Sequence, residues 1–320
     1  MKTIRNIRLA FTMLVILAPL SGCAVLTNNP NATIRVRVVD EAGEPISGVS
    51  ANVYNIYDMD TKPGLTDTNG MHSVHLYNIF HINGSFQKQG YYTSYGVFWK
   101  APEWGKVPPA NTNFTIVMRR IIDPVPMTQR VIRTYLPRND EPVGFDLEVG
   151  DWVRPYGTGK IIDIQMTGKM RYASQVDREV TITADFPEKL CGIQSFVALK
   201  SSAHTPLRSE LMPPYTAPDD GYEPMFSLWR IVDGAHNVKT HENKDQNYLF
   251  RARVVTNEKG EIIRANYGWT VGDIFTEAVK DNRIWLRFTY YYNPDPKSRS
   301  LEPKEIADRQ AKDIPKGGEK

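Results

Sequence analysis

The chain has 320 residues, with 39 Lys and Arg against 36 Asp and Glu, and its first 22 residues contain Lys2, Arg5 and Arg8 but no acid. Without that segment the opposite charges are equal at 36 each. The composition therefore offers no basic surplus that would attract nucleic acid, and no nucleic-acid partner is expected.

Residues 1–22 have the pattern of a secretory signal peptide. The basic start is followed by the apolar run LAFTMLVILAPL, which is too short to span a bilayer. Twelve helical residues extend about 18 Å, whereas the hydrocarbon core is about 30 Å thick. The segment therefore predicts a cleaved signal peptide and not a transmembrane helix.

The sequence Leu20-Ser21-Gly22-Cys23 follows that run and resembles the lipobox of bacterial lipoproteins. The resemblance implies cleavage before Cys23, a diacylglyceryl thioether on its sulfur and acylation of the new amine. Two or more acyl chains hold a protein stably on a membrane. Ala24 stands where similar lipoproteins carry the aspartate of an inner-membrane retention signal, which favours the outer membrane. The alternative is an ordinary signal peptide with a chance cysteine.

Residues 23–31 are expected to form the lipidated cysteine and a short spacer, and residues 32–122 a first domain. Short alternating runs in this domain, separated by Gly, Pro and Asn, predict strands and an all-β fold. These runs cover residues 33–40, 49–55, 71–76, 84–94 and 113–121.

The order of strands and turns in residues 32–122 resembles the carboxypeptidase-regulatory-like, or transthyretin-like, β-sandwich. The matching positions are Asp40, Gly43, Pro45, Gly48, Val49, Thr66, Asp67, Gly70, Lys88, Gly90 and Tyr91. The resemblance implies that these residues build the fold and carry no reaction. A long insertion, FWKAPEWGKVPPANT, departs from the pattern and places Trp99 and Trp104 among prolines, where they could form a binding loop.

Three histidines of the first domain, His72, His75 and His81, raise the possibility of a metal site. On one strand, however, a spacing of three puts His72 and His75 on opposite faces. The turn TDTNG also lacks the carboxylates of a calcium loop, since Leu65 and Leu76 occupy ligand positions. We therefore expect no metal and no cofactor.

After the stiff connector DPVPM, residues 126–302 predict a second β-rich domain. Its strand-like runs cover residues 159–172, 178–186, 191–200, 224–232, 247–255, 260–269 and 283–293. The segment TNEKGE predicts a hairpin between two of them. These runs imply a second β-sandwich, so the expected fold is all-β, with two sandwiches in tandem after the signal peptide. This region matches no characterised family.

Candidate catalytic residues in the second domain lie in loops. Asp219, Asp220 and Glu223 could mimic a glycosidase acid pair, and His236 and His241 a dyad, but solvated loop residues are the simpler interpretation. Nucleophile-elbow, zinc-protease and phosphate-loop motifs are missing from the sequence. No catalytic residue is therefore expected.

The second domain is rich in aromatic residues, most of which the core needs. Strand alternation nevertheless points some of them outward, and Tyr291 is a candidate contact for a sugar or a protein. Cys191 lies in a strand-like run and is expected to be buried. The charged tail over residues 303–320 has few large apolar residues and predicts disorder or a marginal helix.

We therefore expect an envelope lipoprotein, anchored to the membrane, that acts as a non-enzymatic binding or structural module. Its partners would be the membrane, through the lipid anchor, and a glycan or another envelope protein. An accessory carbohydrate-binding lipoprotein of a glycan-utilisation system is the alternative. A hydrolase with an unrecognised site in the second domain is the third possibility.

Overall fold

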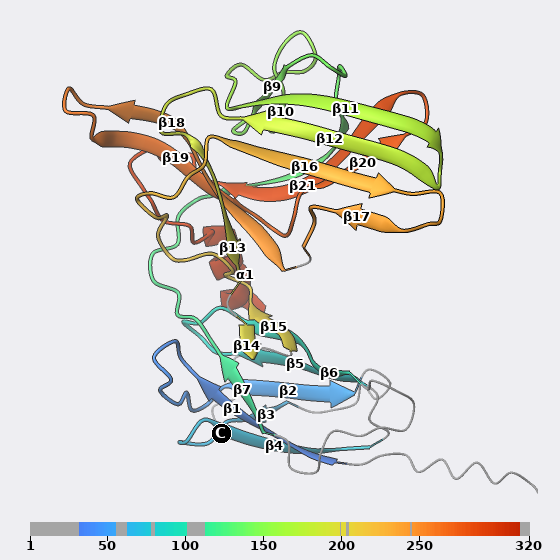
Figure 1. The fold of residues 1–320 in the computed structure, drawn as a ribbon. Helices are drawn as coiled ribbons and strands as arrows, with labels where there is room; N and C mark the ends of the chain where they lie inside the picture. Colours follow the sequence, from blue (N-terminus) through green and yellow to red (C-terminus); the bar gives the residue numbers. More distant parts are fainter. Residues whose placement is uncertain are drawn as a thin grey trace, which may run out of the picture.

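The computed structural model describes residues 32–55, 63–77, 81–100, 113–198, 200–202, 205–243 and 245–313. These residues form an all-β protein with two lobes and one helix, α1 (Figure 1). In the described part of the chain no helix is long and apolar enough to cross a membrane. The predicted signal peptide and Cys23 lie outside the described residues.

The first lobe is a β-sandwich built from two facing sheets. Its own strands are β1 (Ala32–Val39), β2 (Ser50–Asn55), β3 (Gly64–Leu65), β4 (Met71–Leu76), β5 (His81–Gln87), β6 (Ser94–Lys100) and β7 (Asn113–Val117). One sheet has the order β4-β1-β7, with β1 and β7 parallel, and the other contains β6-β5-β2-β3. Alternate residues such as Val36, Val53 and Phe86 fill the core between them.

The predicted turn at TDTNG has the expected chemistry. The Asp67 carboxylate accepts hydrogen bonds from the backbone N–H groups of Asn69 and Met71, at 2.9 and 2.8 Å. Gly70 has a φ of 72°, and a Cβ there would lie 2.4 Å from the carbonyl oxygen of Val38. Glycine is therefore required at this position for both its dihedral angle and its size.

The second lobe is a larger sandwich. One sheet, of order β10-β9-β11-β12-β16-β17, consists of β9 (Val143–Asp146), β10 (Asp151–Trp152), β11 (Ile164–Ser174), β12 (Asp177–Asp185), β16 (Met225–Val232) and β17 (Val238–Thr240). The other, of order β13-β18-β19-β21-β20 with β8 beside β21, consists of β8 (Thr128–Tyr135), β13 (Gly192–Val197), β18 (Gln246–Thr256), β19 (Ile262–Thr270), β20 (Phe275–Val279) and β21 (Arg283–Tyr292). Both sheets contribute to one apolar core.

The alternation predicted for these strands is confirmed in this core. Val180, Ile182, Ala184 and Phe186 of one sheet face Ile284, Leu286, Phe288 and Tyr290 of the other. The predicted hairpin is also present, because β18 and β19 pair antiparallel and the backbone N–H of Asn257 donates to the carbonyl of Glu261 at 3.0 Å. Cys191 is buried as expected, at 3% exposure.

A strand pair that lies within the second region of the chain joins the first lobe's sheet, which the sequence did not indicate. Strands β14 (Lys200–Ser202) and β15 (Thr205–Ser209) follow β13 in the chain but extend the first lobe's sheet. Arg208 and Ser209 of β15 pair with Tyr95 and Ser94 of β6. The sequence assigned all of residues 126–302 to the second domain. Within this range, however, β14 and β15 belong to the first lobe's sheet.

A third apolar cluster joins the lobes. It combines Tyr92 of the first lobe with Leu211, Trp269 and Tyr291 of the second, and with Leu301 and Ile306 near the C-terminus. The buried Glu302 carboxylate accepts hydrogen bonds from the Tyr92 hydroxyl at 3.0 Å and from the backbone N–H of Asp123 at 2.9 Å. Packing and hydrogen bonds thus hold the two sandwiches together.

Of the two alternatives expected for residues 303–320, disorder or a marginal helix, the part that the structure describes forms a helix. Helix α1 (Lys304–Asp313) packs between the lobes, with Ile306 4% and Ala307 6% exposed (Figure 1). The tail has few apolar residues, but they are spaced to face the same cluster. Tertiary packing therefore orders a helix that is marginal by its own propensity.

Candidate functional site

The structure leaves two predicted contact residues untested. The backbone of Trp99 belongs to β6, while its side chain and all of Trp104 lie outside the described residues. Their role in binding stays a prediction.

The exposure predicted for Tyr291 is wrong. Its side chain is 5% exposed and stacks on Trp269, with ring centroids 4.9 Å apart and planes 26° apart. Strand alternation does direct Tyr291 away from the sandwich core, but its register partner Trp269 stacks on it and α1 packs over that end of the sheet. The side chain therefore belongs to the cluster between the lobes and not to a free surface.

The candidate catalytic pairs also remain separate. Asp219, Asp220 and Glu223 are exposed, and Asp219 is paired with Arg299. His236 is exposed in a turn, whereas the side chain of His241 is 8% exposed and lies 3.6 Å from the Asp273 carboxylate. His241 therefore contacts Asp273 and not His236.

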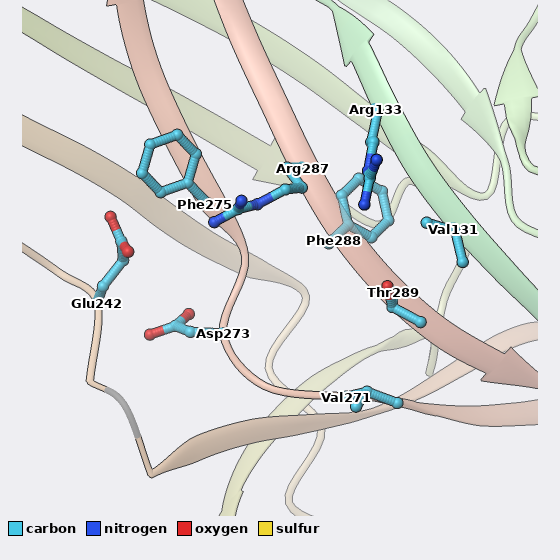
Figure 2. A pocket seen from close by; sticks show the side chains of 9 residues that line it. All are labelled: Val131, Arg133, Glu242, Val271, Asp273, Phe275, Arg287, Phe288 and Thr289. Atoms are coloured by element: carbon cyan, nitrogen blue, oxygen red, sulfur yellow. The ribbon is translucent and has the colours of Figure 1, made fainter.

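A pocket of about 300 Å³ lies on the outer face of the second lobe, beside His241 and Asp273. Strands β19 and β20 pair with successive parts of β21, and the loop that joins them forms one wall of the pocket. Its lining side chains are Val131 and Arg133 of β8, Arg287, Phe288 and Thr289 of β21, Phe275 of β20, and the loop residues Glu242, Val271 and Asp273 (Figure 2). A volume of this size is at the lower end of small-molecule sites.

Strand register places the pocket arginines side by side. Arg287 of β21 pairs with Arg133 of β8 on one side and with Phe275 of β20 on the other. The next pair on the same face of β21 is Trp285 with Tyr135. Directly opposed side chains have Cβ atoms about 4.5–5.5 Å apart. The outer face therefore carries an arginine row next to an aromatic row.

The two arginines lack a compensating acid in the described part of the chain. Neither Arg133 nor Arg287 forms an ion pair with a described carboxylate, and Arg287 lies 4.9 Å from the centre of the Phe275 ring. Opposed like charges destabilise a sheet unless a counter-ion lies between them. The Arg287 guanidinium points away from Arg133 and over the Phe275 ring (Figure 2), so the two groups flank the pocket and an anion would bind between them.

The acids in the pocket, in contrast, already have partners. Glu242 pairs with Arg230 at 3.0 Å. The Asp273 carboxylate accepts hydrogen bonds from the backbone N–H groups of Asn243, at 2.7 Å, and Ile274, at 2.8 Å. Burial raises the pKa of Asp273, but hydrogen bonds from His241 and the backbone outweigh it, so the pKa lies below its ordinary value.

His241 is held in a matching environment. Its Nδ1 lies 2.9 Å from the backbone N and O of Trp229, and its Nε2 lies 3.0 Å from the carbonyl oxygen of Ile274. Burial lowers its pKa, but the Asp273 carboxylate and these carbonyl groups favour the protonated ring, and the net result is a pKa above the ordinary value. The charges of Glu242 and Asp273 are thus largely compensated by Arg230 and His241.

The residues that line the pocket provide hydrogen-bond donors, hydrogen-bond acceptors and apolar contacts for a small ligand. Arginine, threonine and apolar side chains line the pocket, together with carboxylates that are already hydrogen-bonded. Among the described residues, no group of three or more His, Cys, Asp and Glu side chains is placed to hold a metal ion.

The sequence patterns did not indicate this pocket, although strand alternation already directs several of its lining residues outward. Alternation in RIWLRFTYYYN already directs Arg287 outward, and alternation in TQRVIRTY does the same for Val131, Arg133 and Tyr135. The pairing of β8 with β21 spans more than 150 positions, from residue 133 to residue 287, and no local pattern encodes it.

Comparisons with known proteins add little to this geometry. No family model matches the chain, and no curated protein is a significant match. Among solved structures, 3-chlorocatechol 1,2-dioxygenase from Rhodococcus opacus 1CP is similar over 29% of this chain and 60% of its own, at 14% identity and a TM-score of 0.24.

Two other solved structures are similar over a longer stretch. A candidate carbohydrate-binding protein from Bacteroides uniformis ATCC 8492 matches 75% of this chain and 96% of its own, at 12% identity and a TM-score of 0.21. The shaft pilin of Lactobacillus rhamnosus GG matches 74% and 93%, at 11% identity and a TM-score of 0.22. At such TM-scores, no family, ligand or partner passes from these proteins to this chain.

Proposed function

We propose that this protein is a lipid-anchored envelope protein that acts as a non-enzymatic binding module, and that the pocket between β8, β20 and β21 takes an anionic ligand. The observation that carries the binding site is the cross-strand pair Arg133–Arg287, which has no acid partner among the described residues. A bound anion would relieve the repulsion between the two guanidinium groups. Sequence motifs for catalysis are lacking, so binding is favoured over a hydrolase.

The site is tested by titrating the full-length protein, in detergent micelles, with inorganic sulfate, phosphate, acetate and carboxylated saccharides at constant ionic strength. Fluorescence of Trp285, next to Arg287 on β21, offers one readout. We expect at least one anion to bind, and Arg133→Ala or Arg287→Ala to weaken it about tenfold or more, as for the loss of a charged hydrogen bond.

The matched control is Arg171→Ala, which removes an exposed arginine from the other sheet, where it pairs with Asp177. This variant should bind like the wild type. A failure of every anion to bind, or equal binding by all three variants, would contradict the proposed site.

The anchor is a separate part of the proposal and is supported by the basic start, the short apolar run and the lipobox that ends in Cys23. Cys23→Ala should abolish incorporation of labelled palmitate and either release the protein from membranes or leave it unprocessed. Separation of inner and outer membranes should place the wild type in the outer fraction. Palmitate incorporation by Cys23→Ala would refute the anchor.

A further inference from the structure

We infer that the ligand of this pocket is an acidic saccharide, a chain of hexuronic acid units, an inference that rests on the proposed anion site. The two arginines alone would suit any small anion. Three further features of the same surface narrow the ligand to one that carries hydroxyl groups, sugar rings and repeated negative charges.

The first feature is the position of acids beside the arginines. Glu242 and Asp273 line the pocket, and a simple anion would gain nothing from them. Because Arg230 and the backbone N–H groups already compensate these carboxylates, their repulsion of an anion is reduced. Their remaining lone pairs can accept hydrogen bonds from neutral hydroxyl groups. The pocket thus offers donors for a carboxylate and acceptors for hydroxyls, with Arg287 on the same side as the two acids and Arg133 across from them (Figure 2).

The same compensation argues against a zwitterion such as a free amino acid. An ammonium group needs an acid whose charge is available, whereas Glu242 lies 3.0 Å from Arg230, which is also 3.8 Å from Glu277. The charge of Asp273 is shared with the buried His241 at 3.6 Å. Neutral hydroxyl donors fit these acids better than a cation does.

The second feature is the aromatic row next to the arginines. Trp285 and Tyr135 are register partners whose rings meet edge to face, with centroids 4.8 Å apart. Tyr135 is 38% exposed and Val131, on the same face of β8, is 57% exposed. Exposed rings beside polar groups provide an apolar surface on which the carbon face of a sugar can pack. Inorganic sulfate or phosphate would make no use of it.

The third feature is a repeat along one strand. Arg283, Trp285, Arg287 and Thr289 occupy alternate positions of β21 and therefore share its outer face. Successive members are about 7 Å apart, at about 3.3–3.4 Å per residue. The order is charge, ring, charge and hydroxyl. Arg283 also lies 4.4 Å from the centre of the Tyr135 ring, which links the first charge to the aromatic row. The two arginines of this row are four residues and thus about 13 Å apart, so a chain of several acidic rings can reach both, whereas one small anion cannot.

The test compares oligogalacturonate with its fully methyl-esterified form, which keeps the sugar rings and linkages but lacks the charges. Inorganic sulfate and monomeric galacturonate are titrated under the same conditions. We expect oligogalacturonate to bind, the ester to bind at least tenfold more weakly, and the monomer and sulfate to bind more weakly than the oligomer. Trp285→Ala and Tyr135→Ala should each weaken the oligomer about three- to tenfold and leave sulfate unchanged.

The melting temperature of each variant shows whether weaker binding results from unfolding. Trp285 is less exposed than Tyr135 and could be needed for stability, in which case Tyr135→Ala still tests the inference. If sulfate binds as tightly as the oligomer and the aromatic variants bind like the wild type, the saccharide inference fails and the anion site stands. If the ester binds as well as the acid, the saccharide inference fails too, whereas the proposed function itself fails only if no anion depends on Arg133 and Arg287.

Discussion

At the scale of single residues, Arg253 combines an unusual backbone conformation with a buried ion-pair network. It has a φ of 53° at an irregularity of β18, in a region that non-glycine residues rarely adopt. Its guanidinium group binds both oxygens of Asp163, at 2.9 Å each, and one oxygen of Asp146, at 2.7 Å, and it also contacts Glu148. The strained backbone is held because this one cation serves two buried carboxylates.

We expect Arg253→Ala to lower the free energy of unfolding by about 3–5 kcal/mol, the range for removing one partner of a buried ion pair. The side chains of Asp146 and Asp163 are 2% and 1% exposed, so they would be left as uncompensated buried acids. Chemical denaturation measures the change. Arg171→Ala, which breaks an exposed pair with Asp177, should cost at most about 1 kcal/mol. Equal effects of the two substitutions would contradict this account.

Gly70 gives a second prediction at this scale. A valine there would combine a β-branched side chain with a φ of 72° and a Cβ 2.4 Å from a backbone oxygen. We expect Gly70→Val to lower the free energy of unfolding by about 1–3 kcal/mol or more. Gly43→Val is a useful comparison, because φ is 86° but no atom lies within 4 Å of its Cβ, so only the backbone strain remains. A larger loss for Gly43→Val would be the contrary result.

At the scale of elements, β21 shows how far the sequence could be interpreted. Its alternation correctly predicts that Ile284, Leu286 and Phe288 face the core. The same alternation treats Arg287 and Tyr291 alike, although Arg287 is exposed and Tyr291 is buried. The difference arises from what covers the outer face, namely α1 at the Tyr291 end and solvent at the Arg287 end. A single strand's pattern contains no information about elements packed on it from elsewhere in the chain.

We expect the free energy of unfolding to depend on pH because of His241, which lies in the loop between β17 and β18. Its pKa in the folded protein lies above the value of about 6.5 expected in the unfolded chain, so folding favours the protonated ring. That contribution is complete below about pH 6.5 and disappears as the pH rises through the folded-state pKa. The difference in unfolding free energy between wild type and His241→Gln should therefore be larger at about pH 5.5 than at about pH 8.5.

This comparison removes the contribution of other histidines, which both proteins share. His72 acts in the opposite sense, because burial lowers its pKa, and it cancels in the difference. The measurement is denaturation of both proteins across the pH range. A difference that stays constant, or grows with pH, would show that Asp273 and the backbone carbonyls do not favour the charged ring.

At the scale of the whole molecule, sequence patterns predicted two sandwiches but not how they are joined. Turn residues such as Asp67 and Gly70 act locally, so the first lobe could be predicted from its own segment. The β14–β15 hairpin, α1 and the Arg133–Arg287 pair depend on contacts between distant segments, and composition alone did not decide between disorder and a marginal helix for the tail. Both the lobe junction and the candidate site therefore required the three-dimensional structure.

The junction predicts that both lobes unfold together. Tyr92 is fully buried, and its hydroxyl group hydrogen-bonds to Glu302, while Arg119 hydrogen-bonds to the carbonyl of Leu211 at 2.9 Å and pairs with Glu41. Strands β14 and β15 also follow a strand of the second lobe in the chain but pair with the sheet of the first lobe. Neither sandwich can unfold alone without exposing this shared cluster, and we expect one calorimetric transition for the wild type.

Tyr92→Ala should weaken this coupling, because it leaves a cavity at the junction and removes one hydrogen bond to the buried Glu302. Loss of a fully buried aromatic side chain costs about 3–5 kcal/mol. Tyr95→Ala provides the matched control, since Tyr95 lies three residues away on β6 and is 46% exposed. Hydrogen exchange of amides in β2 and β12 then reports each lobe separately. In the wild type and in Tyr95→Ala, the most protected amides of both strands should open with the same free energy, whereas in Tyr92→Ala the two values should separate. Two distinct opening energies in the wild type would mean that the lobes are independent despite their common core.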